Sequence, residues 1–353
     1  MALSKPIEML DAKVLSILLN KSESTIRNML RLGDIPMIQK SKGRITTHKA
    51  LEYRTFINSY NPTVNAVSCT TLSIINPKSS SGKTTTAIHL ASQLKRLKHR
   101  VLLIDLDMQG HASDYAGEAN INEDGVYLPY EMSIHELIVA ASQNRLTAEL
   151  IEKTIRNVEF CDLITCDLRF SNTLRSLCND DSFNILLFNE VIKKITKHIP
   201  YDYIIIDTPS TYSYEQESAL IASDEVLIVS NPNLFSVESI RQCQANIHAA
   251  QKKRLMVKNK PVHLLGLLST NVRVNAVNDF HYFKEIEKYC LNNDINFLST
   301  IIKNNTIVHK AYAMNEDVYS FDPTSDVSLS YFNLTLEIDM DIKQRHLNDN
   351  SRL

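Results

Sequence analysis

The chain has 353 residues, of which 44% are hydrophobic, and a formal net charge of −2 at pH 7. This length accommodates one large α/β domain and a small second domain. The sequence lacks an apolar run of eighteen residues and a basic-then-apolar N-terminal signal, so we expect a cytoplasmic protein without membrane spans.

Positive charge is concentrated at the N-terminus, where residues 1–60 hold ten Lys/Arg and five Asp/Glu. Apolar residues at helical spacing predict helices over 10–19 and 23–32, with a hairpin or wing at 38–45 and a third helix at 47–60. This helix-turn-helix pattern predicts a DNA-binding domain over residues 1–62, whose second helix enters the major groove. An interaction or dimerisation module is the alternative. The candidate DNA-binding residues are Thr25, Arg27, Asn28, Arg31, Lys42 and Arg44.

A short apolar strand, Leu72 to Ile75, precedes a loop of small residues and a helix that opens at Gly82-Lys83-Thr84. This order of strand, loop and helix N-terminus predicts a phosphate site, in which backbone N–H groups of the loop bind the phosphates. Lys83 would contact the β- and γ-phosphates, and the Thr84 hydroxyl would bind Mg²⁺. A serine-rich turn before an ordinary helix is the alternative. The candidate nucleotide-binding residues are Lys78, Ser79, Ser80, Ser81, Gly82, Lys83, Thr84 and Thr85.

The loop resembles the pattern Lys-Gly-Gly-x-Gly-Lys-[Ser/Thr]-Thr, the deviant Walker A of the ParA/MinD family of dimeric ATPases. The resemblance implies an ATP-dependent homodimer in which Lys78 crosses the interface to the other subunit's nucleotide, and Lys78 and Lys83 act in catalysis. Ser79 and Ser80 replace the paired glycines of the family. If either position requires a positive φ, serine costs roughly 1–3 kcal/mol there, which lowers the expected affinity and hydrolysis rate.

The run from Val101 to Gly110 is apolar until it ends in two carboxylates, which predicts a buried strand ending at the ligand-binding edge of a doubly wound sheet. It resembles the family's Asp-x-Asp-Pro-Gln-Gly signature, with Met108 in place of proline. The resemblance implies that Asp107 positions or activates the attacking water, and that Asp105 lies near the Mg²⁺ and the P-loop threonine. Two acids that merely cap a strand are the alternative.

A second apolar strand, residues 201–206, ends at Asp207, which predicts a Walker B carboxylate that holds Mg²⁺ through water. After a strand at 225–230, Asn231 and Pro232 resemble the family loop that borders the adenine, with a plain turn as the alternative. Residues 303–313 resemble the family's late loop and helix near the nucleotide. Strands at 160–165, 264–270 and 295–302 alternate with helices at 131–157, 183–198, 236–252 and 279–291. This alternation predicts an α/β fold with a doubly wound, mostly parallel sheet over residues 68–320.

Residues 321–353 form a C-terminal segment that we expect to pack on the ATPase domain. Apolar residues from Leu334 to Ile342 alternate with period two, as in a strand, whereas the family ends in helices. Acidic residues between them argue against a membrane-binding helix. The basic clusters 252–254, 258–260 and 343–345 are candidate contacts for DNA backbone, although such clusters are more often solvated surface.

The order of these parts resembles the larger partition ATPases, which carry a winged helix-turn-helix ahead of the ATPase. This implies a weak Mg-dependent ATPase for plasmid or chromosome segregation, with ATP/ADP and Mg²⁺ as ligands. It also implies nonspecific DNA binding by a nucleoid-associated dimer, stimulation by a ParB-like centromere-binding protein, and repression of its own operon. The alternative is a nucleotide-switched DNA-binding transcriptional regulator with little ATP turnover. A membrane-positioning ATPase is disfavoured.

Overall fold

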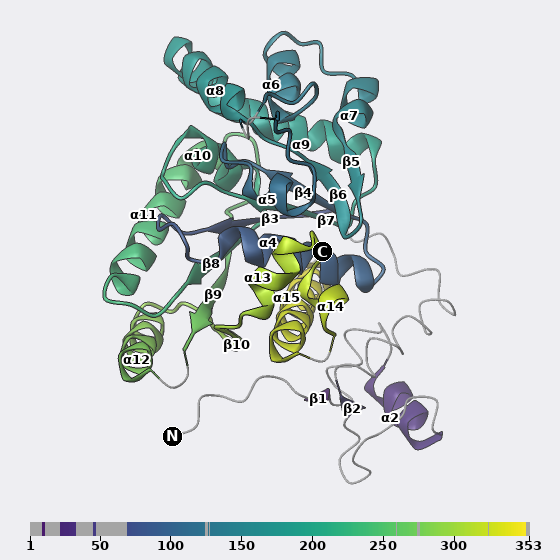
Figure 1. Cartoon of the computed structure of the whole chain (residues 1–353), viewed down its shortest axis with the longest axis vertical. Coiled ribbons are helices and arrows are strands. Elements are labelled where there is room, and N and C mark those ends of the chain that lie inside the picture. The colour runs from purple at the N-terminus through teal and green to yellow at the C-terminus, as the bar shows by residue number, and fades with distance from the viewer. Residues whose placement is uncertain are drawn as a thin grey trace.

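The computed structural model describes residues 9–10, 22–32, 45–46, 69–123, 126, 128–258, 260–273, 276–323 and 325–350. Across these residues the chain forms an eight-stranded sheet in the order β10-β9-β8-β3-β7-β4-β6-β5, in which only the β5–β6 pair is antiparallel (Figure 1). The mostly parallel sheet predicted from the sequence is therefore confirmed. The strands are β3 (Thr70–Ile75), β4 (Val101–Asp105), β5 (Arg156–Val158), β6 (Cys161–Ile164), β7 (Tyr203–Asp207), β8 (Glu225–Ser230), β9 (His263–Val272) and β10 (Phe297–Lys303).

Helices cover both faces of the sheet, because successive side chains of each buried strand point to opposite sides. In β7, Ile204 and Ile206 join one hydrophobic core while Tyr203 and Ile205 join the other. The first core is closed by α6 (Ile134–Ser142), α7 (Ala148–Thr154), α8 (Leu168–Asp180), a 3₁₀ turn (Ser182–Leu186), α9 (Leu187–His198), α10 (Tyr214–Ala222), α11 (Ser236–Arg254) and α12 (Val277–Asn292). The second is closed by α4 (Lys83–Arg96), α5 (His111–Tyr115), α13 (Ile307–Ala313), α14 (Val318–Phe321) and α15 (Asp326–Asn350).

The C-terminal segment forms the long helix α15, so the strand interpretation of residues 334–342 was wrong. The period-two pattern misled because polar residues between the apolar ones are buried as well. Thr335 donates to the Tyr331 carbonyl at 2.9 Å, and Asp339 accepts from the Tyr203 hydroxyl at 2.8 Å and from Lys343 at 2.9 Å. Buried polar residues such as Thr335 and Asp339 remove the contrast between an apolar and a polar face that gives a helical period.

The described part of the N-terminal region contains α2 (Glu23–Leu32), with the bounds predicted for the second helix. The Ser22 hydroxyl accepts the Thr25 N–H at 3.1 Å, as an N-cap does. Ile26 is buried, while Thr25, Arg27 and Asn28 are exposed. Leu10 was predicted to open a helix, but it lies in β1 (Met9–Leu10), which pairs antiparallel with β2 (Ile45–Thr46). Arg31 lies in α2, and Lys42 and Arg44 lie outside the described residues.

Candidate nucleotide site

The loop between β3 and α4 presents a helix N-terminus to an open cavity. Gly82, the N-cap of α4, has a φ of 90°, and no side chain caps the helix, so the first N–H groups are available to an anion. A Cβ at Gly82 would lie 3.3 Å from the Thr270 hydroxyl oxygen. That hydroxyl donates to the Ser81 carbonyl at 2.6 Å. Strand β9 therefore supports the loop directly, and position 82 requires glycine.

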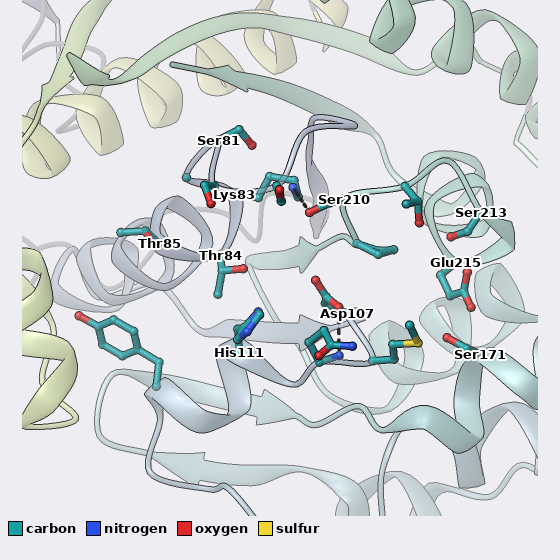
Figure 2. Close-up of a pocket in the computed structure, with 18 of the residues that line it drawn as sticks. Ser81, Lys83, Thr84, Thr85, Asp107, His111, Ser171, Ser210, Ser213 and Glu215 are labelled. Atoms are coloured by element: carbon teal, nitrogen blue, oxygen red, sulfur yellow. Dashed lines mark hydrogen bonds between the residues drawn. The ribbon is translucent and has the colours of Figure 1, made fainter. Parts of the chain in front are cut away.

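The cavity has a volume of about 660 Å³ and is walled by the predicted loop on one side (Figure 2). This volume is within the range of small-molecule sites. Residues from four other places in the sequence complete the wall. They are Asp107, Met108, Gln109, His111 and Tyr115 after β4; Ser171 and Arg175 on α8; Pro209, Ser210, Thr211, Ser213 and Glu215 after β7; and Val308, His309 and Tyr312 on α13.

Lys83 is held inside the loop. Its side chain is buried, and Nζ donates to the Ser210 hydroxyl at 2.9 Å and to the Lys78 carbonyl at 3.1 Å (Figure 2). Burial lowers the pKa of Lys83, while the nearby carboxylates of Asp207 and Asp107 oppose that shift. An ammonium fixed in this position can exchange its hydroxyl and carbonyl partners for phosphate oxygens.

Asp207, at the end of β7, is fully buried, and neither carboxylate oxygen has a hydrogen-bond partner of normal geometry among the described residues. Burial raises the pKa of Asp207 well above its usual value and Asp105 adds to the rise, whereas the Thr84 hydroxyl and Lys83 oppose it. A buried carboxylate with open lone pairs near a threonine hydroxyl fits the Mg²⁺ predicted here. The described residues hold no cluster of three His, Cys, Asp or Glu suited to a metal, so other ligands would be nucleotide oxygens and water.

Asp105 and Asp107 differ in their surroundings. Asp105 is fully buried and accepts hydrogen bonds from Asp107 N at 3.0 Å, Ser113 N at 3.1 Å and the Ser113 hydroxyl at 2.9 Å. Burial raises the pKa of Asp105 to about 7 against these hydrogen bonds. Asp107 lines the cavity and, among the described residues, its carboxylate accepts only from Gln109 N, at 3.0 Å. Asp105 thus fixes the turn that carries Asp107 to the cavity.

Five residues predicted for the nucleotide site do not line the cavity: Lys78, Asp105, Asp207, Asn231 and Pro232. Among the described residues, Lys78 makes hydrogen bonds only through its backbone, donating from N to Asn76 Oδ1 at 2.7 Å and accepting Lys83 Nζ, while its side chain is half-buried. Asn231 follows β8, where its side-chain oxygen accepts from Asn233 at 2.9 Å, and Pro232 is buried beside it. The adenine role of these two residues stays a prediction.

The sequence did not indicate the cavity residues of α8 and α10, because these helices were not predicted. Ser171 and Arg175 follow the acid-ended loop after β6, and Ser213 and Glu215 lie six and eight residues after Asp207. The only available signal was their position after the carboxyl ends of parallel strands, where ligands bind. By contrast, the predicted segment 303–313 does reach the cavity through α13.

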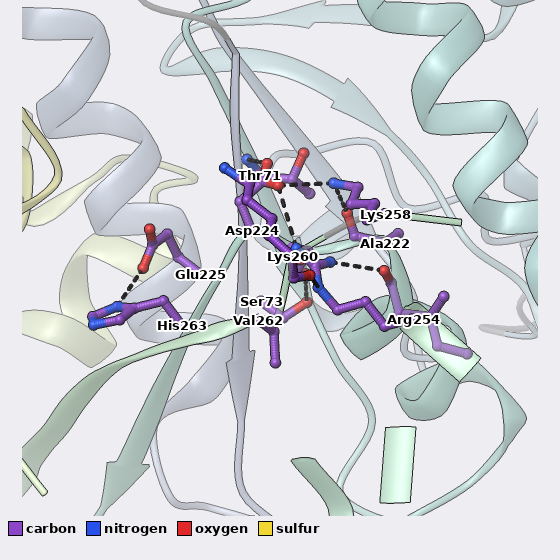
Figure 3. A network of polar contacts seen from close by, with 12 residues as sticks. Thr71, Ser73, Ala222, Asp224, Glu225, Arg254, Lys258, Lys260, Val262 and His263 are labelled. Carbon is purple, nitrogen blue, oxygen red and sulfur yellow. Dashed lines mark hydrogen bonds and ion pairs between the residues drawn. The ribbon is translucent and has the colours of Figure 1, made fainter. Parts of the chain in front are cut away.

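Two of the basic clusters considered for DNA are partly structural (Figure 3). Arg254 is fully buried and donates to the carbonyls of Ile221 and Ser223 and, at 3.1 Å, to that of Lys260. Lys258 donates to the Ala222 carbonyl at 2.7 Å and pairs with Asp224 at 2.9 Å. These two cations, which were candidate contacts for DNA backbone, stabilise the polypeptide between α10 and β8.

The comparisons with known proteins decide the family. A family model described as an AAA domain matches residues 69–262, more than half of the chain. The protein belongs to this family and is of the ParA/MinD type. Over 267 residues it is 26% identical to the sporulation initiation inhibitor protein Soj of Bacillus subtilis strain 168, covering 76% of this chain and 97% of Soj.

Solved structures resemble this ParA/MinD-type protein over the same region. A putative plasmid partition protein of Borrelia burgdorferi B31, bound to AMPPNP, is 26% identical with a TM-score of 0.58, covering 77% of this chain and 99% of that one. The septum site-determining protein MinD of Pyrococcus horikoshii OT3, complexed with Mg-ADP, is 20% identical with a TM-score of 0.53. The match covers 77% of this chain and 96% of the MinD chain. At that identity MinD shows the fold alone. Solved structures of this fold hold adenine nucleotide and magnesium, the ligands that were predicted from the sequence.

Within the described residues, no helix of this ParA/MinD-type protein combines the length and apolar character needed to cross a bilayer.

Proposed function

We propose that this protein is a Mg-dependent DNA-partition ATPase of weak turnover. The observation that carries the proposal is that Lys83 and Asp107 line an open cavity at a helix N-terminus, with the buried carboxylate of Asp207 close enough to Lys83 to affect its pKa. The similarity to Soj and to a plasmid partition protein supports segregation as the process.

Each residue has a distinct task in the proposed hydrolysis. The loop N–H groups and Lys83 bind the β/γ-phosphates and stabilise charge on them, as phosphoryl transfer requires. Thr84 and Asp207 would hold Mg²⁺, which supplies further charge neutralisation. Asp107 orients the attacking water, and Asp105 holds the turn that places Asp107.

The deviant Walker A assigned to residues 78–85 gives Lys78 an intermolecular role. Its side-chain amine makes no hydrogen bond or ion pair with the residues that the structure describes, and its backbone is fixed at both ends. We infer an ATP-dependent homodimer in which this amine reaches the nucleotide of the second copy.

The proposed division of the chain is a DNA-binding domain over 1–62, an ATPase domain over 68–320 and a C-terminal segment over 321–353. The first would bind an operator to repress its own operon, through Thr25, Arg27, Asn28 and Arg31 of α2 together with Lys42 and Arg44. The ATP dimer would bind nonspecific DNA on the nucleoid, and a ParB-like centromere-binding protein would stimulate hydrolysis.

Steady-state hydrolysis and sedimentation with Mg-ATP test the enzymatic core. We expect Lys83→Ala to abolish nucleotide binding, and Asp107→Ala to abolish turnover while keeping the ATP-dependent dimer. Lys78→Ala should retain nucleotide binding and lose the dimer. A wild-type chain that stays monomeric at saturating Mg-ATP, with Asp107→Ala equally monomeric, would refute the proposal.

A second function has one observation in its favour. Ser80, in place of a family glycine, has a left-handed φ of 58°. Strain in the phosphate loop favours a transcriptional regulator that binds nucleotide as a switch and hydrolyses little. Absence of turnover with DNA and partner present, together with nucleotide-dependent operator binding, would support this alternative over the ATPase.

A further inference from the structure

The loop that follows β7 is held by side chains from two directions. It begins at Asp207, the carboxylate proposed for Mg²⁺, and reaches Ser210, whose hydroxyl accepts from Lys83 Nζ at 2.9 Å (Figure 2). Between them, the carbonyl of the buried Pro209 accepts from Gln216 Nε2 of α10 at 3.3 Å. Pro209 and Ser210 line the cavity. A contact from α10 therefore acts on the same short loop that carries the metal carboxylate.

Gln216 is the inner end of a chain of three side-chain amides. Its Oε1 accepts from Asn246 Nδ2 at 3.2 Å, and Asn246 Oδ1 accepts from Gln242 Nε2 at 2.8 Å. Gln216 and Asn246 are 1% and 3% exposed, whereas Gln242 lies on the exposed face of α11. The chain of amides therefore runs from the surface of α11, through the interior, to the loop after β7.

The direction of this chain is fixed at its inner end. A backbone carbonyl only accepts, so Pro209 requires the NH₂ group of Gln216, and the Gln216 oxygen is left to accept from Asn246. The same reasoning turns the Asn246 oxygen toward Gln242. Reversing one amide would bring two oxygens or two NH₂ groups together in a buried place, where such a contact is costly. Each amide thus sets the orientation of the next.

We propose that Gln216 is a positioning residue for the metal side of the nucleotide site, and that Asn246 orients it. The inference rests on the proposed Mg-ATP site and deepens it. Gln216 holds the loop at Pro209, two residues after Asp207, so its loss lets the metal carboxylate shift. Lys83 is less affected, because its amine also donates to a carbonyl of its own loop. Binding of Mg²⁺ should therefore respond to Gln216 more than binding of the nucleotide phosphates alone.

The test is titration of the full chain with a fluorescent ATP analogue at increasing Mg²⁺ concentration. We expect Gln216→Leu to raise the Mg²⁺ concentration for half-maximal binding about 3- to 10-fold, the usual effect of losing one hydrogen bond. Nucleotide affinity measured without Mg²⁺ should be unchanged. Gln244→Leu is the matched control, because Gln244 is a half-buried amide of α11 that lies outside the chain and accepts from the Tyr289 hydroxyl at 2.7 Å.

Asn246→Asp tests the orientation of the chain. A carboxylate only accepts, so Gln216 must turn its NH₂ group toward the new carboxylate and its oxygen toward the Pro209 carbonyl. We expect the Mg²⁺ requirement to rise as in Gln216→Leu, although Asn246 does not line the cavity. In the Gln216→Leu background, Asn246→Asp should add nothing. Gln242→Glu, a change at an exposed position, turns both buried amides the same way and should shift the requirement in the same direction.

Urea unfolding of the same variants separates positioning from packing. A Gln216→Leu variant that loses stability but keeps the wild-type Mg²⁺ requirement overturns the inference, as does a Gln244→Leu variant that shares the increase. Effects of Gln216→Leu and Asn246→Asp that multiply also overturn it. If neither buried variant folds, a wild-type requirement in Gln242→Glu overturns it. A wild-type protein whose ATP binding does not depend on Mg²⁺ refutes the proposed function instead.

Discussion

The two serines of the phosphate loop should respond to glycine with opposite signs. Ser80 has a φ of 58°, whereas Ser79 is not among the residues with positive φ. Both are exposed, and neither side chain makes a hydrogen bond to the described residues, so the substitutions act through the backbone. A left-handed conformation costs a non-glycine residue about 1–2 kcal/mol. Glycine removes that cost, but it lowers the free energy of unfolding by about 0.5–1 kcal/mol because it gives the unfolded chain more conformational entropy.

Ser80→Gly should therefore raise the free energy of unfolding by about 1 kcal/mol, while Ser79→Gly should lower it by about 0.5–1 kcal/mol. Urea unfolding of the nucleotide-free protein measures both changes. The midpoint urea concentration should rise for Ser80→Gly and fall for Ser79→Gly, while the dependence of the unfolding free energy on urea concentration stays the same. Ser79→Gly serves as the matched control, because it makes the same chemical change one residue away. Shifts of the same sign at both positions would refute the assignment of strain to Ser80.

Three further results are expected. Burial raises the pKa of Asp105 to about 7, so the folded protein keeps a proton that the unfolded chain loses near pH 3.8. Stability of the nucleotide-free protein should fall as pH rises from about 4 to 7, by up to about 1.4 kcal/mol per pH unit, and Asp105→Asn should flatten this slope in urea titrations. Arg254→Met should cost about 3–5 kcal/mol of stability because it strands buried acceptors, whereas Arg241→Ala, which breaks an exposed pair, should cost under about 1 kcal/mol; equal costs would contradict the structural role of Arg254. Asp207→Asn should remove the Mg²⁺ dependence of ATP binding in calorimetric titrations without destabilising the nucleotide-free fold, since neither carboxylate oxygen has a hydrogen-bond partner of normal geometry among the described residues; retained Mg²⁺ dependence would contradict its role.

The sheet was predictable because buried parallel strands are continuous apolar runs. The runs that end in Asp105 and Asp207 also identify the edge of the sheet where a ligand binds, since parallel strands share one carboxyl end. The glycine that opens α4 completes the pattern. The strand-ending aspartates and the glycine before α4 each lie within a short stretch of sequence. The chemistry of phosphate and metal binding sets the spacing of the residues within each stretch.

Helix α10 was not predictable in the same way, because its burial does not follow its polarity. Residues Glu215 to Ala222 of α10 are all buried, although three of the first four are charged or amide residues. Glu217 is neutralised by Lys253 on α11, a contact between residues 36 apart in the sequence. A pattern that depends on a distant partner cannot be inferred from the local sequence, so the cavity residues of α10 were missed.

The same limit applies to charge, and it bears on where the proposed DNA binding resides. Residues 61–353 carry 28 Lys/Arg and 35 Asp/Glu, a formal charge of −7, against +5 for residues 1–60. Within the body, Arg254 and Lys258 are committed to carbonyls and Asp224, and Arg345 to Glu225 at 2.8 Å. These three cations therefore add little to the positive surface, whereas Lys252 and Lys260 of the same clusters stay exposed. Because affinity for DNA phosphates depends on positive charge, and positive charge is concentrated in residues 1–60, that region is the stronger candidate for the operator contacts.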